Sequence, residues 1–233
     1  MGDSVLRYKT LLFDADETLF DFARAEREAI SDTLTALGVQ PTDALILSYS
    51  RINEAMWKRL ERGEITKAAL KTERFAVYAV ENELSLDAKT AADTYVQCLA
   101  KKPYLFAGVT AFCEKLSKTH ALYIITNGIG SVQRSRFALS GLAPYFRDLF
   151  ISEALGAEKP ARAYFDAVAR RIKDFSPKDT LVIGDSLSSD IKGGITAGLA
   201  TCWYNKKGMT PPADVKPDYT VSTLEELSAL LCP

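Results

Sequence analysis

Three short apolar runs, each followed at once by polar residues, constrain the fold of this 233-residue chain most strongly. The runs are almost unbroken, which is typical of strands buried on both faces of a parallel sheet. They are residues 8–13, 121–125 and 180–183, with weaker strand candidates at 149–151 and 200–204 and helical patterns at about 108–118, 130–140, 160–173, 187–197 and 222–231. Alternating strands and helices predict a doubly wound α/β sheet.

Residues from about 22 to 103 contain no convincing strand and several helical patterns. An apolar stripe at spacings of three and four is formed by Leu45, Tyr49, Ile52, Met56 and Leu60. An insertion of this size is too large to be a loop. We therefore expect a core domain of residues 1–21 and 104–233 and a helical cap domain of residues 22–103.

Charge and cysteine usage narrow the possible partners and environment. The chain has 29 Lys and Arg against 30 Asp and Glu, so it lacks the basic excess expected of a protein that binds a nucleic-acid polymer. None of its four cysteines lies in a Cys-x-x-Cys pair, which disfavours a zinc site and fits a reducing cytosol. No signal peptide or apolar run of about 18 residues is seen, so we expect a cytoplasmic protein with no membrane span.

The first apolar run ends in the acidic segment DADETLFD, residues 14–21. Ligands bind at the carboxyl ends of strands in α/β sheets, which places Asp14 at an expected site. Asp14 and Asp16 repel each other unless a divalent cation binds between them or one holds a proton. Such a pair suits phosphate chemistry, in which one Asp attacks phosphorus and a second acid protonates the leaving oxygen. A capping Asp beside a solvated one is the alternative.

Two further segments offer groups that bind phosphate. Thr126 provides a hydroxyl, and the backbone N–H groups that follow can form an anion-binding nest, although a plain Asn-Gly turn is the alternative. Pro160 is predicted to open a helix, which puts Lys159 just before a helix start. An ammonium group there can neutralise a phosphate or shield an attacking carboxylate, and a solvated lysine is the alternative.

A fourth segment, GDSLSSD, follows the run at 180–183. Asp185 lies at the predicted strand end and Asp190 about one turn later, and hard oxygen ligands of this kind suit Mg²⁺. Capping explains either Asp alone, but not easily both. Because parallel strands place their carboxyl ends together, we expect the four segments to converge on one site.

These motifs together resemble the haloacid dehalogenase superfamily of phosphohydrolases over nearly the whole chain. DADETLFD is similar to the first motif of the superfamily, Thr126-Asn127-Gly128 to the second, Lys159-Pro160 to the third and GDSLSSD to the fourth. The resemblance also implies that the helical insertion is a cap of the first cap class.

The resemblance implies a role for each matching residue. Asp14 would be the nucleophile and Asp16 the general acid/base. Thr126, Lys159 and the Asn127 backbone would hold the phosphate. The implied ligands of Mg²⁺ are the Asp14 carboxylate, the Asp16 main-chain carbonyl and Asp185, with Asp190 supporting the waters on the metal.

A closer resemblance is to the house-cleaning pyrimidine 5′-nucleotidases of bacteria. It rests on DADETLF, where most relatives have Gly in place of Glu17, on the pattern from Trp57 to Thr66, and on ITNG, ISE and GLATCW. It implies Mg²⁺-dependent hydrolysis of pyrimidine nucleoside monophosphates, a small-molecule substrate class. Asn53 and Trp57, one helical turn apart, are candidates to face the site, with Trp57 stacking on a base. A Trp packed in the core is the alternative.

Other readings stay open. Related sugar-phosphate and phosphoglycolate phosphatases share several of these motifs, and a phosphomutase would keep the full magnesium set. A hydrolytic dehalogenase of the same superfamily needs neither the acid at position 16 nor the metal, so Asp16, Asp185 and Asp190 argue against it. A binding module without catalysis would not need every one of these groups.

Overall fold

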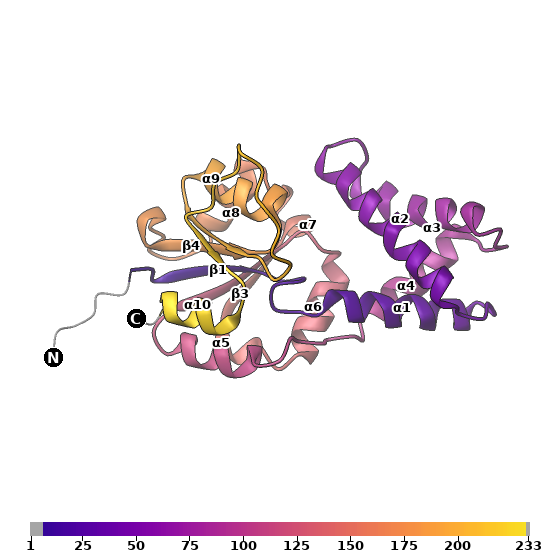
Figure 1. The fold of residues 1–233 in the computed structure, drawn as a ribbon, viewed down its shortest axis with the longest axis horizontal. Helices are drawn as coiled ribbons and strands as arrows, with labels where there is room; N and C mark the ends of the chain where they lie inside the picture. The colour runs from indigo at the N-terminus through magenta and orange to yellow at the C-terminus, as the bar shows by residue number, and fades with distance from the viewer. Residues whose placement is uncertain (1–6, 232–233) are drawn as a thin grey trace. The chain divides into compact units, whose positions relative to one another are not determined.

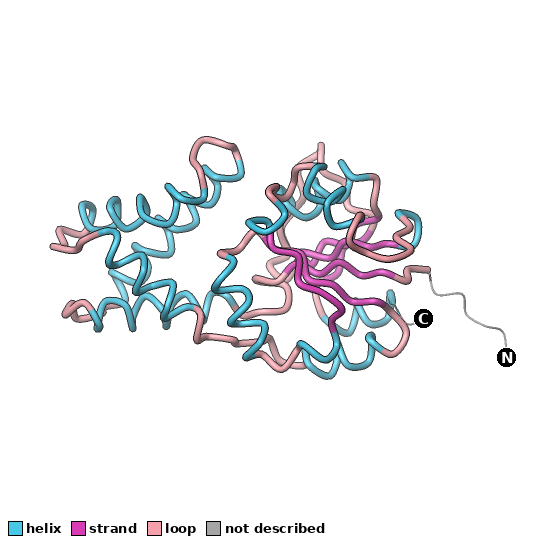
Figure 2. The backbone as a smooth tube through the Cα atoms, turned by 180° about the vertical axis from the view of Figure 1, so that it is seen from behind, coloured by secondary structure: helices cyan, strands magenta, loops and turns pink. Residues whose placement is uncertain are grey.

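The computed structural model describes residues 7–231, which form two compact units. The core unit comprises the chain up to Asp21 together with the chain from Leu105 onward, and the helical unit is Phe22–Tyr104. Every strand in Figure 2 lies in the core unit. Within the core unit, an antiparallel bridge joins Phe20 to Leu105, where the chain leaves this unit and returns to it. Cys232 and the first six residues, which bear on the cysteine and signal-peptide predictions, lie outside the described residues.

The core unit is built on a six-stranded parallel sheet with the order β3-β2-β1-β4-β5-β6. The strands are β1 (Thr10–Asp14), β2 (Ala121–Thr126), β3 (Phe146–Ile151), β4 (Thr180–Gly184), β5 (Ala200–Tyr204) and β6 (Tyr219–Val221). The predicted doubly wound α/β fold is confirmed. The chain runs outward from β1 in both directions, so the strand order reverses between β1 and β4, where open α/β sheets bind their ligands.

Helices cover both faces of the sheet. Figure 1 shows α5 (Val109–Ser117) and α10 (Leu224–Leu231) on one face, and α8 (Arg162–Ala169) and α9 (Lys192–Ala197) on the other. Successive side chains of β1 point to opposite faces: Leu11 and Phe13 pack with the α5 side, and Leu12 packs with the α8 side. Burial on both faces explains why this strand reads as an unbroken apolar run.

Four helices make the helical unit: α1 (Phe22–Ala36), α2 (Asp43–Glu61), α3 (Lys67–Glu81) and α4 (Ala88–Leu99). The predicted stripe on α2 is buried at Tyr49, Ile52, Met56 and Leu60, whereas Leu45 is half-buried and Ile46 is buried instead. Rings from α3 and α4 pack around Tyr49 of α2, with centroids 5.0–5.6 Å away. The unit therefore has an aromatic core of its own.

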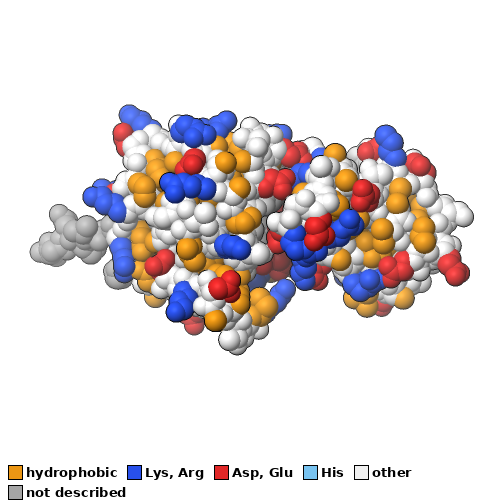
Figure 3. Space-filling model, turned by 90° about the horizontal axis from the view of Figure 1, so that it is seen from above, with side chains coloured by type: hydrophobic (Ala, Val, Ile, Leu, Met, Phe, Trp, Pro, Cys, Tyr) orange, Lys and Arg blue, Asp and Glu red, His pale blue; other side chains and the backbone are white. Residues whose placement is uncertain are grey.

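On one face of the molecule, the charged side chains do not separate by sign. On the face seen in Figure 3, basic and acidic side chains are intermingled, in keeping with the net charge of −1. Within residues 7–231, no helix combines the length and the apolar character that a membrane span requires.

Candidate active site

Asp14 is the last residue of β1 and is 8% exposed. The chain turns sharply after it, because the backbone N–H groups of Leu19 and Phe20 both donate to the carbonyl oxygen of Ala15, at 2.9 Å each. The turn returns Thr18 toward Asp14, and the Thr18 hydroxyl donates to Asp14 Oδ2 at 3.3 Å. The carboxylate is thus fixed at the carboxyl end of the sheet, as predicted for Asp14.

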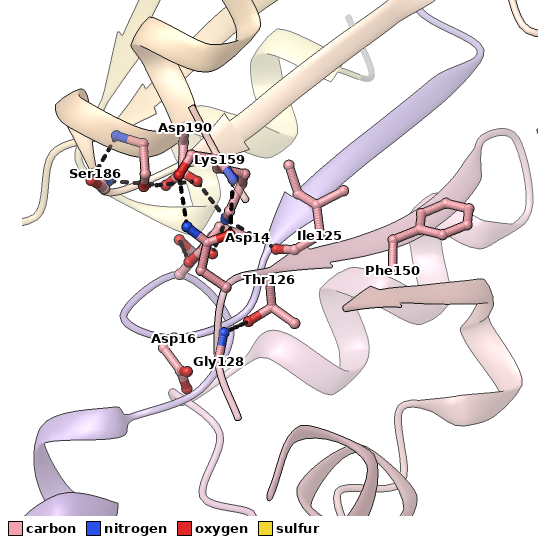
Figure 4. Close-up of polar contacts among 12 residues, drawn as sticks. Asp14, Asp16, Ile125, Thr126, Gly128, Phe150, Lys159, Ser186 and Asp190 are labelled. Carbon is pink, nitrogen blue, oxygen red and sulfur yellow. Dashed lines mark hydrogen bonds and ion pairs between the residues drawn. The ribbon is translucent and has the colours of Figure 1, made fainter. Parts of the chain in front are cut away.

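Lys159 lies between two of the predicted aspartates (Figure 4). Its Nζ is 2.6 Å from Asp14 Oδ1 and 2.6 Å from Asp190 Oδ1, and it also donates to the Ile125 carbonyl oxygen at 3.2 Å. All three donor positions of the buried ammonium group therefore have acceptors. Burial disfavours the charged ammonium, but the charges of Asp14 and Asp190 outweigh it and raise the pKa of Lys159.

The side chain of Asn127 holds the Lys159 backbone in place. Asn127 Nδ2 donates to the Lys159 carbonyl oxygen at 2.8 Å, and the Lys159 N–H donates to Asn127 Oδ1 at 2.9 Å. Helix α8 begins at Arg162, so the prediction that Pro160 opens a helix is wrong. The reason is a turn at this point, closed by the Ala161 N–H donating to the Glu158 carbonyl oxygen at 2.8 Å.

Asp190 is fully buried and is reached from the end of β4 through one π-helical turn, Leu187–Ile191. The Ser186 N–H donates to Asp190 Oδ2 at 3.1 Å, and the Ser186 hydroxyl oxygen caps the turn by accepting from the Ser189 N–H. Both oxygens of Asp190 thus have a partner, Ser186 on one and Lys159 on the other. The buried charge is thereby compensated.

Three carboxylates converge at this edge. Asp14, Asp185 and Asp190 each offer an oxygen, and these oxygens lie within 4.8 Å of one another. Burial, followed by the charge of Asp190, raises the pKa of Asp14 well above its ordinary value. Burial, followed by the charges of Asp190 and Glu17, raises the pKa of Asp185 to about 7. This excess of negative charge and the hard oxygen ligands fit a divalent cation such as Mg²⁺.

The Asp16 side chain points away from this cluster (Figure 4). It faces α6 (Gly130–Leu139), where Arg136 Nη1 donates to Asp16 Oδ1 at 2.5 Å and Gln133 Nε2 donates to Asp16 Oδ2 at 2.9 Å. The structure thus brings Asp14, Lys159, Asp185 and Asp190 together and holds the Asp16 carboxylate by separate partners.

Thr126 ends β2, and its hydroxyl oxygen accepts from the Gly128 N–H at 3.0 Å (Figure 4). This backbone donor of the predicted anion-binding nest is therefore used within the turn. The Thr126 N–H donates to the Tyr164 hydroxyl, which in turn donates to the Phe150 carbonyl oxygen. These bonds fix the end of β2 against α8 and β3.

Sequence reasoning missed Gln133, Arg136 and Lys206. Lys206, in the segment after β5, has its Nζ 3.4 Å from Glu17 Oε2 and 3.3 Å from the centre of the Phe106 ring. Glu17 has a φ of +60°, a left-handed conformation that costs a residue other than glycine roughly 1–2 kcal/mol. The resemblance to the superfamily's first motif, which implies Gly at this position, was a signal of that conformation. Lys206 follows a predicted strand, so its position near the site could have been expected from the sequence.

The helical unit places Asn53 in its interior. Asn53 is 2% exposed, donates from Nδ2 to Glu26 Oε1 at 2.6 Å, and accepts from Arg74 Nη1 at 2.8 Å. Asn53 is therefore a member of a buried polar network, which argues against its candidacy as a residue facing the site. Trp57 is half-buried, and its stacking on a base stays a prediction.

Fold and sequence together define the class of this protein. The haloacid dehalogenase-like hydrolase family matches residues 8–198, a range that includes every predicted site residue. The chain belongs to this family, and it is a hydrolase. The resemblance seen in the four motifs is confirmed.

Three relatives that align over nearly their whole length show which members of the family this chain is similar to. The chain is 37% identical to the HAD-hydrolase YfnB of Bacillus subtilis, over 97% of this chain and 96% of YfnB. It is 38% identical to the pyrimidine 5′-nucleotidase PynA of Streptococcus pneumoniae, over 94% and 93%. It is 32% identical to the pyrimidine 5′-nucleotidase YjjG of Escherichia coli, over 97% and 99%. The resemblance to the nucleotidase subgroup is thus confirmed as a similarity.

Solved structures agree on the fold. The crystal structure of YfnB bound to magnesium superimposes with a TM-score of 0.93 at 37% identity, covering 97% of this chain and 100% of YfnB. The L-2-haloacid dehalogenase of Xanthobacter autotrophicus gives a TM-score of 0.75 at 18% identity, over 96% of this chain and 98% of the dehalogenase. At that identity the dehalogenase shares the fold alone.

Proposed function

We propose that this enzyme is a magnesium-dependent phosphatase that hydrolyses small phosphomonoesters through an aspartyl-phosphate, with pyrimidine nucleoside 5′-monophosphates as preferred substrates. The observation that supports it most directly is the convergence of Asp14, Lys159 and the cluster of three carboxylates at the carboxyl edge of the sheet. A carboxylate nucleophile, an ammonium group and a metal site are the groups that phosphoryl transfer requires.

The proposed magnesium ligands are the Asp14 and Asp185 carboxylates and the Asp16 main-chain carbonyl, with Asp190 supporting the waters around them. When bound, the ion would supply positive charge beside the phosphate oxygens. The three mutually close carboxylates and the magnesium-bound structure of YfnB support this assignment.

In the first proposed step, an oxygen of Asp14 attacks phosphorus and the bond from phosphorus to the leaving oxygen breaks. Asp16 gives its proton to that oxygen. In the second step, Asp16 takes a proton from water as the water oxygen attacks phosphorus. The bond between phosphorus and Asp14 then breaks, which releases inorganic phosphate and restores the carboxylate.

The chain's own residues prepare these steps. Lys159 stands 2.6 Å from the proposed nucleophile and shields its charge as an anionic substrate approaches. Asn127 supports the site by fixing the Lys159 backbone through two hydrogen bonds, in addition to its proposed backbone contact with phosphate. In the proposed assignment, the Thr126 hydroxyl donates to a phosphoryl oxygen.

Residues 22–103 are proposed to act as a cap that selects the substrate and excludes water during attack. Their separate aromatic core supports this role, because the unit can present a rigid surface to a ligand. Trp57→Ala should raise the KM for nucleotides without raising the KM for a small aryl phosphate. Equal effects on both substrates would remove Trp57 from substrate selection.

The nucleotide preference is supported by the likeness to PynA and YjjG, both named pyrimidine 5′-nucleotidases. A sugar-phosphate phosphatase is the second candidate. It is favoured by the N-acylneuraminate-9-phosphatase of Mus musculus, which is 29% identical over 97% of this chain and 94% of that enzyme.

The cytoplasmic location stays a prediction.

The test is release of inorganic phosphate with and without Mg²⁺. The panel is uridine, deoxyuridine and thymidine 5′-monophosphates, their purine counterparts, phosphoglycolate and sugar phosphates. Mg²⁺-dependent turnover that is fastest on pyrimidine nucleotides is the expected result. Turnover confined to sugar phosphates or phosphoglycolate would remove the nucleotide preference. Formation of a phosphate isomer without release would indicate a phosphomutase, and no turnover by folded protein would indicate a binding module.

A further inference from the structure

Two side chains of α6 join Asp16 to Thr126. Gln133 Nε2 donates to Asp16 Oδ2 at 2.9 Å and to Thr126 Oγ1 at 2.7 Å. Arg136 Nη1 donates to Asp16 Oδ1 at 2.5 Å and to Gln133 Oε1 at 3.2 Å. A continuous set of hydrogen bonds therefore links the proposed proton-transfer group to the proposed phosphate-binding hydroxyl.

The arrangement is buried and closely fitted. Gln133 is 3% exposed and Arg136 is fully buried, and their spacing of three residues puts both on one face of α6. The Arg136 guanidinium lies 4.8 Å from the centre of the Phe20 ring. A Cβ on Gly128 would stand 2.5 Å from Gln133 Nε2, so glycine at 128 leaves the room that Gln133 needs. Burying an amide or a guanidinium group costs free energy unless the group is hydrogen-bonded. The hydrogen bonds to Asp16 therefore stabilise Gln133 and Arg136 in these positions.

The bonds on Thr126 also fix the direction of its hydroxyl. Thr126 Oγ1 accepts from the Gly128 N–H at 3.0 Å and from Gln133 Nε2 at 2.7 Å. These two bonds use both lone pairs of the oxygen, so the hydroxyl must direct its own proton outward as a donor. A phosphoryl oxygen is the acceptor that the proposed function supplies.

We propose that Gln133 and Arg136 are positioning residues, which hold the Asp16 carboxylate for proton transfer and, through Gln133, aim the Thr126 hydroxyl at the phosphate. The inference rests on the proposed function, because it assigns these two residues to the same reaction. Proton transfer matters most when the leaving oxygen is a poor leaving group. Replacing either residue should therefore lower activity more on a substrate with a poor leaving group than on one with a good leaving group.

The experiment compares two substrates: p-nitrophenyl phosphate, whose leaving group needs no proton, and the alkyl phosphate that the wild type hydrolyses fastest. The variants are Gln133→Met, which keeps the side-chain size, and Arg136→Met, with Asp16→Asn as the reference. Arg134→Met is the matched control, because Arg134 lies on the same helix and is exposed. For Gln133→Met and Arg136→Met we expect kcat/KM, which covers the steps up to loss of the leaving group, to fall about 100-fold on the alkyl phosphate and less than about tenfold on the aryl phosphate.

The outcomes separate the two proposals. Equal losses of kcat/KM on both substrates in variants with a wild-type circular dichroism spectrum would overturn the positioning role. The role would also be overturned if Gln133→Met and Arg136→Met hydrolysed the alkyl phosphate as fast as the wild type, while Asp16→Asn lost more activity on the alkyl than on the aryl phosphate. A wild type that releases no phosphate from either substrate would overturn the proposed function and the inference with it. Partial recovery of alkyl turnover in Arg136→Lys, which keeps one charged donor, would support the role.

Discussion

The Asp190 carboxylate lies against the α-carbon of Gly184, so closely that a Cβ at position 184 would stand 2.2 Å from Asp190 Oδ2. No side chain fits in that space, because real Cβ atoms do not approach another heavy atom below 3.0 Å. The glycine at the end of β4 thus permits the contact between Asp190 and Lys159.

Gly184→Ala should therefore displace Asp190 and break its ion pair with Lys159. We expect the free energy of unfolding to fall by about 1–3 kcal/mol from overpacking, and phosphate release to fall at least about tenfold. Urea unfolding and a turnover assay measure the two effects. In an Asp190→Gly background the added methyl should cost much less, because the carboxylate and the Cβ that it would meet are both gone. Additive losses would contradict this explanation.

Asp14→Asn should bind inorganic phosphate and lose turnover. The amide keeps the size of the carboxylate and leaves Lys159 and Thr126, the proposed phosphate-binding residues, unchanged, but an amide oxygen is a poor nucleophile. We expect kcat to fall by about 10³-fold or more, because removing a nucleophile removes the covalent step. Calorimetric titration with phosphate measures binding. Turnover near that of the wild type would remove Asp14 as the nucleophile.

Asp185→Asn should stabilise the protein without metal and abolish the stability that Mg²⁺ adds. Because folding raises the pKa of Asp185 to about 7, its charged form opposes folding at pH 8, and this penalty declines as the pH falls from 7 toward 4. Without metal, the neutral amide should therefore stabilise the protein at pH 8. With Mg²⁺, only the wild type should gain stability, by about 2.7 kcal/mol at 100 times the dissociation constant. Equal gains with Mg²⁺ in both proteins, measured by thermal unfolding, would exclude Asp185 as a ligand.

His120, the single histidine, should make the protein sensitive to mild acid. It is 4% exposed, and burial lowers its pKa below 6.5, opposed in part by a hydrogen bond with the Leu116 carbonyl oxygen. The unfolded chain therefore takes up a proton before the folded protein does, so the contribution of His120 to stability falls as the pH drops through 6.5. His120→Gln should lose less stability than the wild type between pH 7.5 and 5.5 in urea unfolding. The same loss in both would contradict the assignment.

The sequence reveals those elements that are buried on both faces. The strands β1, β2 and β4 are continuous apolar runs and were predicted directly. The three residues of β6 are half-buried, exposed and buried in turn, so they leave no run to detect. Pattern reasoning thus finds the centre of a parallel sheet more readily than its edge.

The same limit applies to the site. Asp14 and Asp185 directly follow predicted strands, so their meeting could be expected from topology. Gln133 and Arg136 could not be found in this way, because nothing in the sequence of α6 says which face meets Asp16. Asn53 was misjudged for a related reason: its partners, Glu26 and Arg74, come from two other helices, which helical periodicity cannot reveal.

The bridge between Phe20 and Leu105 has an evolutionary consequence. Because the outgoing and returning segments are already paired in the core unit, deleting residues 22–104 would leave two ends that a short turn can join. The helical unit is thus a separate insertion, which recombination can exchange between relatives without changing the sheet. Chimaeras that carry another family member's insertion would reveal how far catalysis and substrate choice have evolved as separable traits.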